Sequence, residues 1–383
     1  QTRVAGENVG TYAISQGTLS AGSNYTISYT GSNLTINPAT LTVAADAGQK
    51  KTYGDADPAS YTYGYSGLVN GDTSAVFTGA QARVAGENAG AYAISQGTLS
   101  AGGNYTISHT GDSFTINKAT LTVTANSGQT KTYGAANPTY TYGYSGLVNG
   151  DTATVFTGSQ TRAAGENVGN YAISQGTLSA GSNYTISYTG DTIAINPATL
   201  TVTANARSKT YGAADPTLPY AYSGLVNGDT AAVFSGSQIR AIGENVGTYA
   251  ISQGTLSAGS NYTISYTGND LTINPATLTV TANSNQSKTY GAGDPTYAYS
   301  YSGLVNGDTA SVFSGSQARA SGENAGNYGI SQGTLSAGSN YTISYTGNSF
   351  TINPATLTVT ATTLGKSYGQ ADPALSYNLS GLK

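Results

Sequence analysis

Apolar and polar residues alternate along the chain in short stretches that are separated by Gly, Asn, Asp and Pro. In residues 198–204, Leu200 and Val202 alternate with threonines. In residues 261–267, tyrosine and isoleucine alternate with Thr, Ser and Asn. A period of two with β-branched and aromatic residues is typical of a half-buried β-strand. The pattern therefore predicts a mostly β fold.

The residues around these two stretches predict further elements. Turn residues such as Gly212 and Pro216 predict a turn-rich segment over residues 209–216, after the first strand. Asp229 or Thr230 is a candidate cap for a short helix. The other expected elements are a strand with an aromatic face over 220–222 and 225–226, a helix through 233–234, and strands over 248–252 and 271–273.

Two motifs recur at a constant spacing along the whole chain. The first, Ala-Thr-Leu-Thr-Val, begins at Ala39, Ala119, Ala198, Ala276 and Ala355. The second, Gln-Gly-Thr-Leu-Ser-Ala-Gly, begins at Gln16, Gln96, Gln175, Gln253 and Gln332. A period of about 79 residues is longer than the ~20–50 residues of common solenoid repeats. It is long enough for a small domain with its own core, so we expect a tandem array of domains.

The recurrence divides the chain into four whole repeats and a partial repeat at each end. Each whole repeat is expected to begin at the Ala-Thr-Leu-Thr-Val strand and to end just before the next copy. The expected boundaries are 1–38 (partial), 39–118, 119–197, 198–275, 276–354 and 355–383 (partial).

A single residue joins consecutive repeats, so no flexible linker lies between them. It is proline at Pro38, Pro197, Pro275 and Pro354, and lysine at Lys118. Because proline fixes its own φ and disfavours helix in the residue before it, we expect neighbouring domains to keep an extended relation. We expect the junction at Lys118 to bend more easily. A compact repeat of this size would be about 30 Å across, so almost five in file would span roughly 150 Å.

Composition excludes several functions. Only 8% of residues are charged, the net charge is −4, and the 14 basic residues are spread along the chain. A nucleic-acid-binding protein needs clustered Lys and Arg, which this chain lacks. No apolar run approaches the ~20 residues of a membrane span. The absence of Cys excludes disulfides and Cys-ligated metals.

No residue pattern indicates catalysis, so we expect no enzyme, no catalytic residue and no cofactor. His109 is the one histidine, and tyrosine fills its place in the other repeats (Tyr29, Tyr188, Tyr266, Tyr345). A position that tyrosine fills elsewhere is a packing position. A Ser-His-Asp triad would have to depend on this one histidine.

The recurrent acidic residues are candidate ligands for calcium, which prefers several oxygen ligands close together. They are isolated and form no Asp-x-Asp-x-Asp-Gly run, so capping, turn or ion-pair roles are favoured over a metal site. Arg and Glu recur four residues apart, which predicts surface ion pairs worth ~0–1 kcal/mol. The residues are Asp72, Asp151, Asp229, Asp308, and the pairs Arg83/Glu87, Arg162/Glu166, Arg240/Glu244 and Arg319/Glu323.

Three other features allow a functional and a structural interpretation. A lysine crosslink to Asn beside an acid would need a desolvated, neutral Lys, which the sequence does not indicate. An Asn-Tyr-Thr sequon recurs at Asn24, Asn104, Asn183, Asn261 and Asn340, where Asn is also an ordinary turn residue. The tyrosines could contact glycans, but at period two beside Ile and Leu most are expected in the core.

The Lys-Thr-Tyr-Gly motif carries a resemblance to a known family. It begins at Lys51, Lys131, Lys209 and Lys288, with Lys-Ser-Tyr-Gly at Lys366. Asp-Pro or Asn-Pro follows, then a Tyr-rich strand and Ser-Gly-Leu. The chain resembles the MBG-type (YGX-type) tandem repeats of bacterial surface and secreted adhesins, as in filamentous-haemagglutinin-like exoproteins. The resemblance implies β-grasp-like or sandwich-like domains of about 79 residues, end to end, outside the bacterial cell.

These observations predict a structural or adhesive stalk of a bacterial extracellular or cell-surface repeat protein, which projects or links cells, as in a biofilm. One alternative is a self-assembling extracellular filament or matrix subunit. Another is a module that binds glycan or a host surface weakly but many times over. The expected partners are other copies of the chain or a cell surface, and calcium is not favoured.

Overall fold

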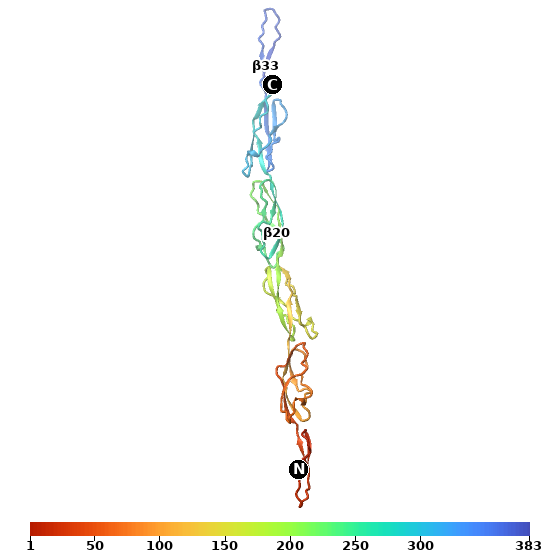
Figure 1. Cartoon of the computed structure of the whole chain (residues 1–383). Helices are drawn as coiled ribbons and strands as arrows, with labels where there is room; N and C mark the ends of the chain where they lie inside the picture. The colour runs from red at the N-terminus through yellow and green to blue at the C-terminus, as the bar shows by residue number, and fades with distance from the viewer. The chain divides into compact units, whose positions relative to one another are not determined.

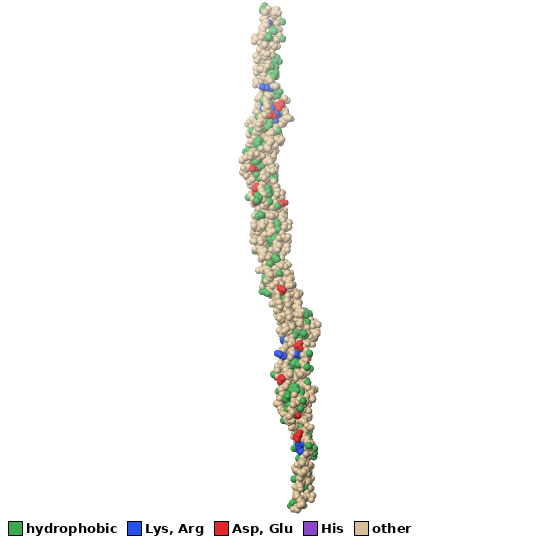
Figure 2. Space-filling model, viewed as in Figure 1, with side chains coloured by type: hydrophobic (Ala, Val, Ile, Leu, Met, Phe, Trp, Pro, Cys, Tyr) green, Lys and Arg blue, Asp and Glu red, His purple; other side chains and the backbone are tan.

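The computed structural model describes residues 1–383, and almost all of its regular elements are β-strands (Figure 1). The chain forms two compact units, residues 1–196 and residues 197–383. Both contain sheets that recur about every 79 residues, which confirms the expected mostly β tandem array. Most of the face shown in Figure 2 consists of backbone and of side chains that are neither hydrophobic nor charged, and the charged side chains there occur in a few separate places.

Residues 39–117, the first repeat, form two mixed sheets. In the three-stranded sheet, β4 pairs in parallel with β9 and antiparallel with β6. In the four-stranded sheet, β10 pairs in parallel with β5 and antiparallel with β8, which also pairs with β7. The strands are β4 (Ala39–Ala45), β5 (Lys50–Thr52), β6 (Tyr63–Ser66), β7 (Ala82–Arg83), β8 (Gly90–Ser95), β9 (Tyr105–Thr110) and β10 (Ser113–Asn117).

Residues 119–196, the second repeat, have the same two sheets in the orders β13-β11-β16 and β12-β17-β15-β14. The strands are β11 (Ala119–Ala125), β12 (Gln129–Thr132), β13 (Tyr142–Ser145), β14 (Thr161–Arg162), β15 (Gly169–Ser174), β16 (Tyr184–Thr189) and β17 (Asp191–Asn196). Before the first repeat, a three-stranded sheet contains β1 (Thr2–Arg3), β2 (Gly10–Ser15) and β3 (Ser32–Ile36).

Residues 198–274 and 276–353, the third and fourth repeats, have the same topology. The third contains β18 (Ala198–Ala204), β19 (Arg207–Thr210), β20 (Tyr220–Ser223), β21 (Ile239–Arg240), β22 (Gly247–Ser252), β23 (Tyr262–Thr267) and β24 (Asn269–Asn274). The fourth contains β25 (Ala276–Ala282), β26 (Gln286–Thr289), β27 (Tyr299–Ser302), β28 (Ala318–Arg319), β29 (Gly326–Ser331), β30 (Tyr341–Thr346) and β31 (Asn348–Asn353). A two-stranded sheet of β32 (Thr358–Ala361) and β33 (Tyr377–Ser380) follows.

Each repeat contains one turn of 3-10 helix, where the sequence predicted a short helix. In the third repeat the Thr230 side chain accepts a hydrogen bond from the Ala232 N–H, so Thr230, and not Asp229, is the cap. The four helices are η1 (Ser74–Val76), η2 (Ala153–Val155), η3 (Ala231–Val233) and η4 (Ala310–Val312). None is long or apolar enough to cross a membrane.

Two local predictions were wrong. Lys209 and Thr210, expected in a turn-rich segment, lie in β19, which pairs in parallel with β24. Leu225 and Val226 lie outside the strand expected to include them, because β20 ends at Ser223 and Gly224 takes a left-handed φ of +105°. That conformation suits glycine and interrupts the extended backbone. The domain boundaries expected from the sequence stay predictions.

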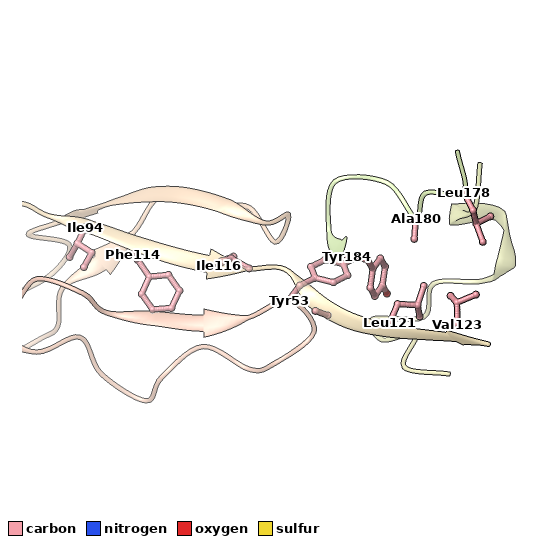
Figure 3. Close-up of a cluster of buried hydrophobic side chains, with 10 residues drawn as sticks. Tyr53, Ile94, Phe114, Ile116, Leu121, Val123, Leu178, Ala180 and Tyr184 are labelled. Atoms are coloured by element: carbon pink, nitrogen blue, oxygen red, sulfur yellow. The ribbon is translucent and has the colours of Figure 1, made fainter. Parts of the chain in front are cut away.

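The core follows the alternation in the sequence. In β11, buried Leu121 and Val123 alternate with exposed threonines. These two side chains belong to an apolar cluster that also contains Ile94, Phe114 and Ile116 of the first repeat (Figure 3). The first and second repeats therefore share buried apolar contacts across their junction.

Candidate functional site

The Lys-Thr-Tyr-Gly motif places two buried side chains on one face of the chain. Lys51 lies in β5, and Tyr53 is the first residue after that strand. Because the two residues are two positions apart in extended backbone, their buried side chains point to the same side. Gly54 has a φ of +90°, and a Cβ there would lie 2.5 Å from Val148 Cγ2 of the second repeat. The glycine is therefore required both for the backbone conformation and for the close approach of the next repeat.

Two tyrosines and an aspartate meet at the junction between the first and second repeats. Tyr53 donates a hydrogen bond of 3.0 Å to Asp151 Oδ2, and Tyr184 donates one of 2.7 Å to the same oxygen. The tyrosine rings pack edge to face with centroids 5.5 Å apart (Figure 3). Asn149 Nδ2 donates to the Tyr53 hydroxyl. We name Tyr53, Asp151 and Tyr184 the tyrosine–aspartate clamp.

The asparagine of the sequon makes a second contact across the same junction. Asn183 Oδ1 accepts the Ala89 N–H at 2.9 Å, and its Nδ2 donates to Asn88 Oδ1 at 3.0 Å. A glycan on Asn183 would replace one hydrogen of its Nδ2 group. The glycan would also have to fit between the two repeats. The geometry therefore favours a structural role for this sequon asparagine.

The third and fourth repeats make the same contacts at their own junction. One aspartate again accepts from two tyrosines, and a glycine again faces a valine of the following repeat. The clamp consists of Tyr211, Asp308 and Tyr341, the asparagines are Asn306, Asn340 and Asn245, and the close pair is Gly212 and Val305.

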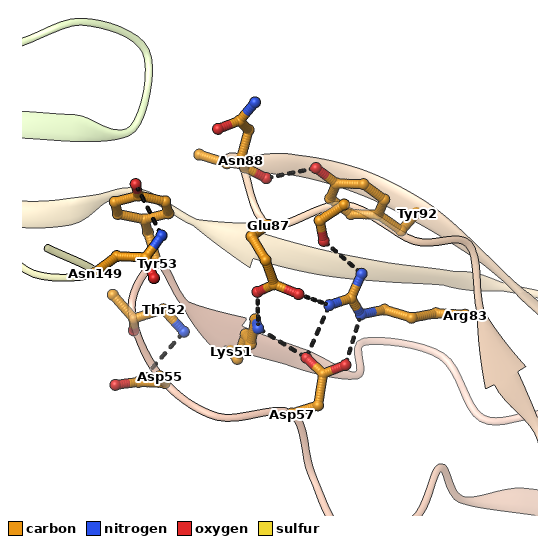
Figure 4. Close-up of polar contacts among 12 residues, drawn as sticks. Lys51, Thr52, Tyr53, Asp55, Asp57, Arg83, Glu87, Asn88, Tyr92 and Asn149 are labelled. Atoms are coloured by element: carbon orange, nitrogen blue, oxygen red, sulfur yellow. Dashed lines mark hydrogen bonds and ion pairs between the residues drawn. The ribbon is translucent and has the colours of Figure 1, made fainter. Parts of the chain in front are cut away.

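Four charged residues of the first repeat form a closed network beside the clamp (Figure 4). Lys51 Nζ lies 2.7 Å from Asp57 Oδ1 and 2.5 Å from Glu87 Oε2. Arg83 pairs with the same two carboxylates, at 2.9 Å and 2.5 Å. The predicted Arg–Glu pair is thus present, but it is part of a larger network. Only 5% of the Lys51 and Arg83 side chains is exposed, against 38% for Asp57 and 57% for Glu87.

The network keeps its members charged. Hydrogen bonds from Arg83, and then from Lys51, lower the pKa of Asp57 to about 2. Burial lowers the pKa of Lys51, but its hydrogen bonds to Asp57 and Glu87 outweigh burial, and the net shift is upward. A lysine crosslink needs a neutral amine, so the charged state opposes the crosslink considered from the sequence.

The second repeat differs because Asn137 replaces the aspartate. Arg162 Nε donates to Asn137 Oδ1 at 3.0 Å, so the arginine keeps its neighbour. Lys131 keeps Glu166 and donates its other bond to the Ala135 carbonyl at 3.0 Å. The third and fourth repeats have the full network, with Lys209/Asp215/Arg240/Glu244 and Lys288/Asp294/Arg319/Glu323.

Two further candidate residues, His109 and Asp72, have structural partners. His109 Nε2 lies 2.9 Å from Gln81 Nε2, and Tyr188 makes the equivalent contact with Gln160 in the second repeat. Asp72 accepts from Tyr105, like the other clamp aspartates. No three His, Asp or Glu side chains gather in a group that could hold a metal ion. The sequence interpretation missed the buried glutamines, which no local motif distinguishes.

The exposed tyrosines form a second class beside the buried ones. In each repeat one tyrosine of the short aromatic strand is 42–45% exposed and packs on a phenylalanine. These are Tyr65 on Phe77, Tyr144 on Phe156, Tyr222 on Phe234 and Tyr301 on Phe313. The prediction that most tyrosines lie in the core therefore does not apply to this position.

The profile of the MBG domain (YGX type) matches the chain five times. The matched residues are 1–35, 41–115, 121–194, 200–272 and 278–351. No curated protein matches the chain.

Proposed function

Because the chain belongs to the MBG domain family of the YGX type, we propose that it is a structural stalk of a bacterial extracellular or cell-surface protein. In this role consecutive repeats hold one another and carry a binding part away from a surface. The chain is a tandem repeat protein, and its repeats are rich in β-strands.

The observation that carries the proposal is the contact between consecutive repeats. A spacer must resist bending, and bending at a junction requires contacts between its two sides to break. Tyr53 and Asn183 each bond across the junction at Lys118, and the apolar cluster is continuous there. The same set of contacts occurs at the junction at Pro275.

A weak, multivalent adhesive is the second candidate, and a specific observation favours it. The exposed tyrosine recurs once in each of the four repeats. Tyrosine presents a large amphipathic surface at low entropic cost, and equal sites in tandem gain avidity when they engage one partner together.

Electron microscopy of the purified chain tests the stalk. We expect single, unbranched particles of one length, and we expect a Tyr53→Ala/Tyr211→Ala variant to bend sharply at two places. Tyr144→Ala/Tyr301→Ala is the matched control, because it removes exposed tyrosines and leaves both clamps intact. Ordered bundles of wild-type chains would support the filament instead, and particles that bend freely without substitution would contradict the stalk.

A further inference from the structure

Two repeats contain a cavity at the same place, where the residues before the aromatic strand face the Gly-Ser-Gln segment. In the second repeat the cavity has a volume of about 390 Å³, and Pro138, Tyr140, Tyr142, Ser159 and Gln160 are among its lining residues. In the fourth repeat it has a volume of about 400 Å³ and the equivalent lining, with Pro295, Tyr297, Tyr299, Ser316 and Gln317. Both volumes lie in the range of small-molecule sites.

A buried amide with an unpartnered polar atom lines each cavity. Gln160 is 5% exposed, and its Nε2 donates to the Tyr188 hydroxyl at 2.7 Å, whereas its Oε1 has no partner. Gln317 bonds Tyr345 in the same way and also leaves Oε1 unpartnered. Exchanging the amide oxygen and nitrogen would leave the nitrogen unpartnered instead. Gln81 and Gln238, at the equivalent positions of the first and third repeats, also have unpartnered amide atoms, so the feature is common to all four repeats. A buried polar group without a partner destabilises a fold, so its recurrence needs an explanation.

The second repeat has one more unpartnered group. In the fourth repeat the Tyr297 hydroxyl donates to Asp294 at 2.9 Å, and in the first repeat Tyr61 donates to Asp57. Asn137 replaces this aspartate, and the buried Tyr140 hydroxyl has no partner. Gln160 and Tyr140 line the cavity of the second repeat and have unused hydrogen-bonding capacity. Their unpartnered atoms are closed to solvent, so a ligand can bond them only after these side chains turn toward it.

The lining selects the chemistry of a ligand. No charged side chain lines the cavity of the second repeat, and Asp294 in the fourth is neutralised by Lys288 and Arg319. A charged ligand would therefore find no free side chain of opposite charge to pair with. A purely apolar ligand would leave the polar groups of the lining unpartnered. Tyrosine rings and a proline offer apolar faces, while Thr, Ser, Gln and the tyrosine hydroxyls offer hydrogen bonds.

A pyranose ring matches this lining, because it combines an apolar C–H face with hydroxyls that both donate and accept. We propose that the cavity binds a single hexose unit of a neutral carbohydrate. One hexose has few atoms, so each site binds weakly, with a Kd on the order of millimolar. A polysaccharide that reached several repeats would bind more tightly through avidity. This binding is independent of the stalk, so either proposal can fail without the other.

Saturation-transfer NMR on the full chain tests the proposal, with D-glucose, D-galactose, D-mannose and N-acetyl-D-glucosamine as separate probes. We expect transfer to at least one of the four sugars. Ser159→Trp/Ser316→Trp should remove most of it, because both serines are exposed residues that line the cavities. Ser237→Trp is the matched control at the equivalent position of the third repeat, where Leu218 replaces the first tyrosine. We expect it to change the transfer little.

A second variant distinguishes binding in the cavity from adsorption to exposed tyrosines. Asn137→Asp would give the Tyr140 hydroxyl the partner that Tyr297 has, and it should lower the affinity of that site about fivefold, the value of one ordinary hydrogen bond. The proposal is overturned if no sugar shows transfer, or if the Trp and Asp variants leave the transfer unchanged. Binding of a proline-rich peptide with no sugar binding would also overturn it.

Discussion

The junction at Lys118 and the junction at Pro275 differ in the linking residue but share their side-chain contacts. At the first, Tyr53 bonds to Asp151 at 3.0 Å. At the second, Tyr211 bonds to Asp308 at the same distance. Because a flexible Lys and a rigid Pro accompany the same clamp, we infer that side-chain contacts, and not the linker, hold consecutive repeats together.

The apolar contacts lead to the same conclusion. At Lys118, Phe114 and Ile116 belong to one buried cluster with Leu121 of the next repeat. At Pro275, Ile273 belongs to one cluster with Leu278. Each repeat therefore completes part of its core with its neighbour, so its stability should depend on that neighbour.

Removing the clamp tyrosine should give the largest effect at both junctions. Tyr53→Ala and Tyr211→Ala should each lower the free energy of unfolding by about 3–5 kcal/mol, because a buried aromatic ring and its hydrogen bond are lost. Urea unfolding of the full chain measures this loss. Tyr144→Ala, at a site 45% exposed, is the control and should cost much less. Equal losses at buried and exposed sites would remove the distinction between clamp and surface tyrosines.

Blocking the close approach of the next repeat should give the second largest effect. In Gly54→Ala and Gly212→Ala the new Cβ would lie 2.5 Å and 2.4 Å from the facing valine, and we expect a loss of about 1–3 kcal/mol. Gly48→Ala and Gly228→Ala are matched controls, because these glycines also have positive φ but no atom lies within 4 Å of the added Cβ. The difference between each variant and its control isolates the contact across the junction. No difference would mean that the valine moves away at no cost.

The charged network should give a smaller, acid-sensitive effect. The pKa of Asp57 is about 2 in the folded chain, below the ordinary 3.8, so its stabilisation is complete above pH 3.8 and is lost as the pH falls through about 2. Because Asp57 is 38% exposed, we expect Asp57→Asn to cost only about 1 kcal/mol at neutral pH and clearly less near pH 2, where the folded-state carboxylate is about half protonated.

Asn137→Asp is the converse variant of the second repeat. It should add a similar stabilisation, about 1 kcal/mol, that disappears in the same acidic range. Unfolding curves at neutral pH and near pH 2 measure both variants. A cost for Asp57→Asn that does not change with pH would show that charge is not its source.

Exchanging the linking residues should give the smallest effect. Lys118→Pro and Pro275→Lys should each change the free energy of unfolding by no more than about 0.5 kcal/mol, because the contacts that hold the junction remain. Thermal unfolding of the full chain measures this change. A large loss from either exchange would show that the linker, and not the clamp, sets the junction.

Much of the fold was predictable because its signal is local. Strand β18 was evident from alternating Leu200 and Val202, and the Thr230 cap lies next to the helix that it begins. Strand β19 was missed because it has only four residues and one buried side chain, Lys209, which shows no apolar alternation. Its pairing with β24 links residues more than 60 positions apart, and no local pattern encodes such a pairing.

The candidate site was less predictable for the same reason. Tyr53 and Asp151 lie 98 residues apart in the sequence, and each belongs to a different local motif. The burial of Gln81 is not predictable from the sequence, because a glutamine gives no local signal of burial. The repeat identified the important positions, but only the structure relates a position in one repeat to a different position in the next.

Hydrogen exchange of the full chain, read by mass spectrometry in wild type and Tyr53→Ala, tests most directly whether consecutive repeats stabilise one another. Tyr53 belongs to the first repeat, and its partners Asp151 and Tyr184 belong to the second. We predict faster exchange in β11 and β16 of the second repeat as well as in the first. Faster exchange confined to residues 39–117 would contradict the account, because it would show that each repeat is stable without its neighbour.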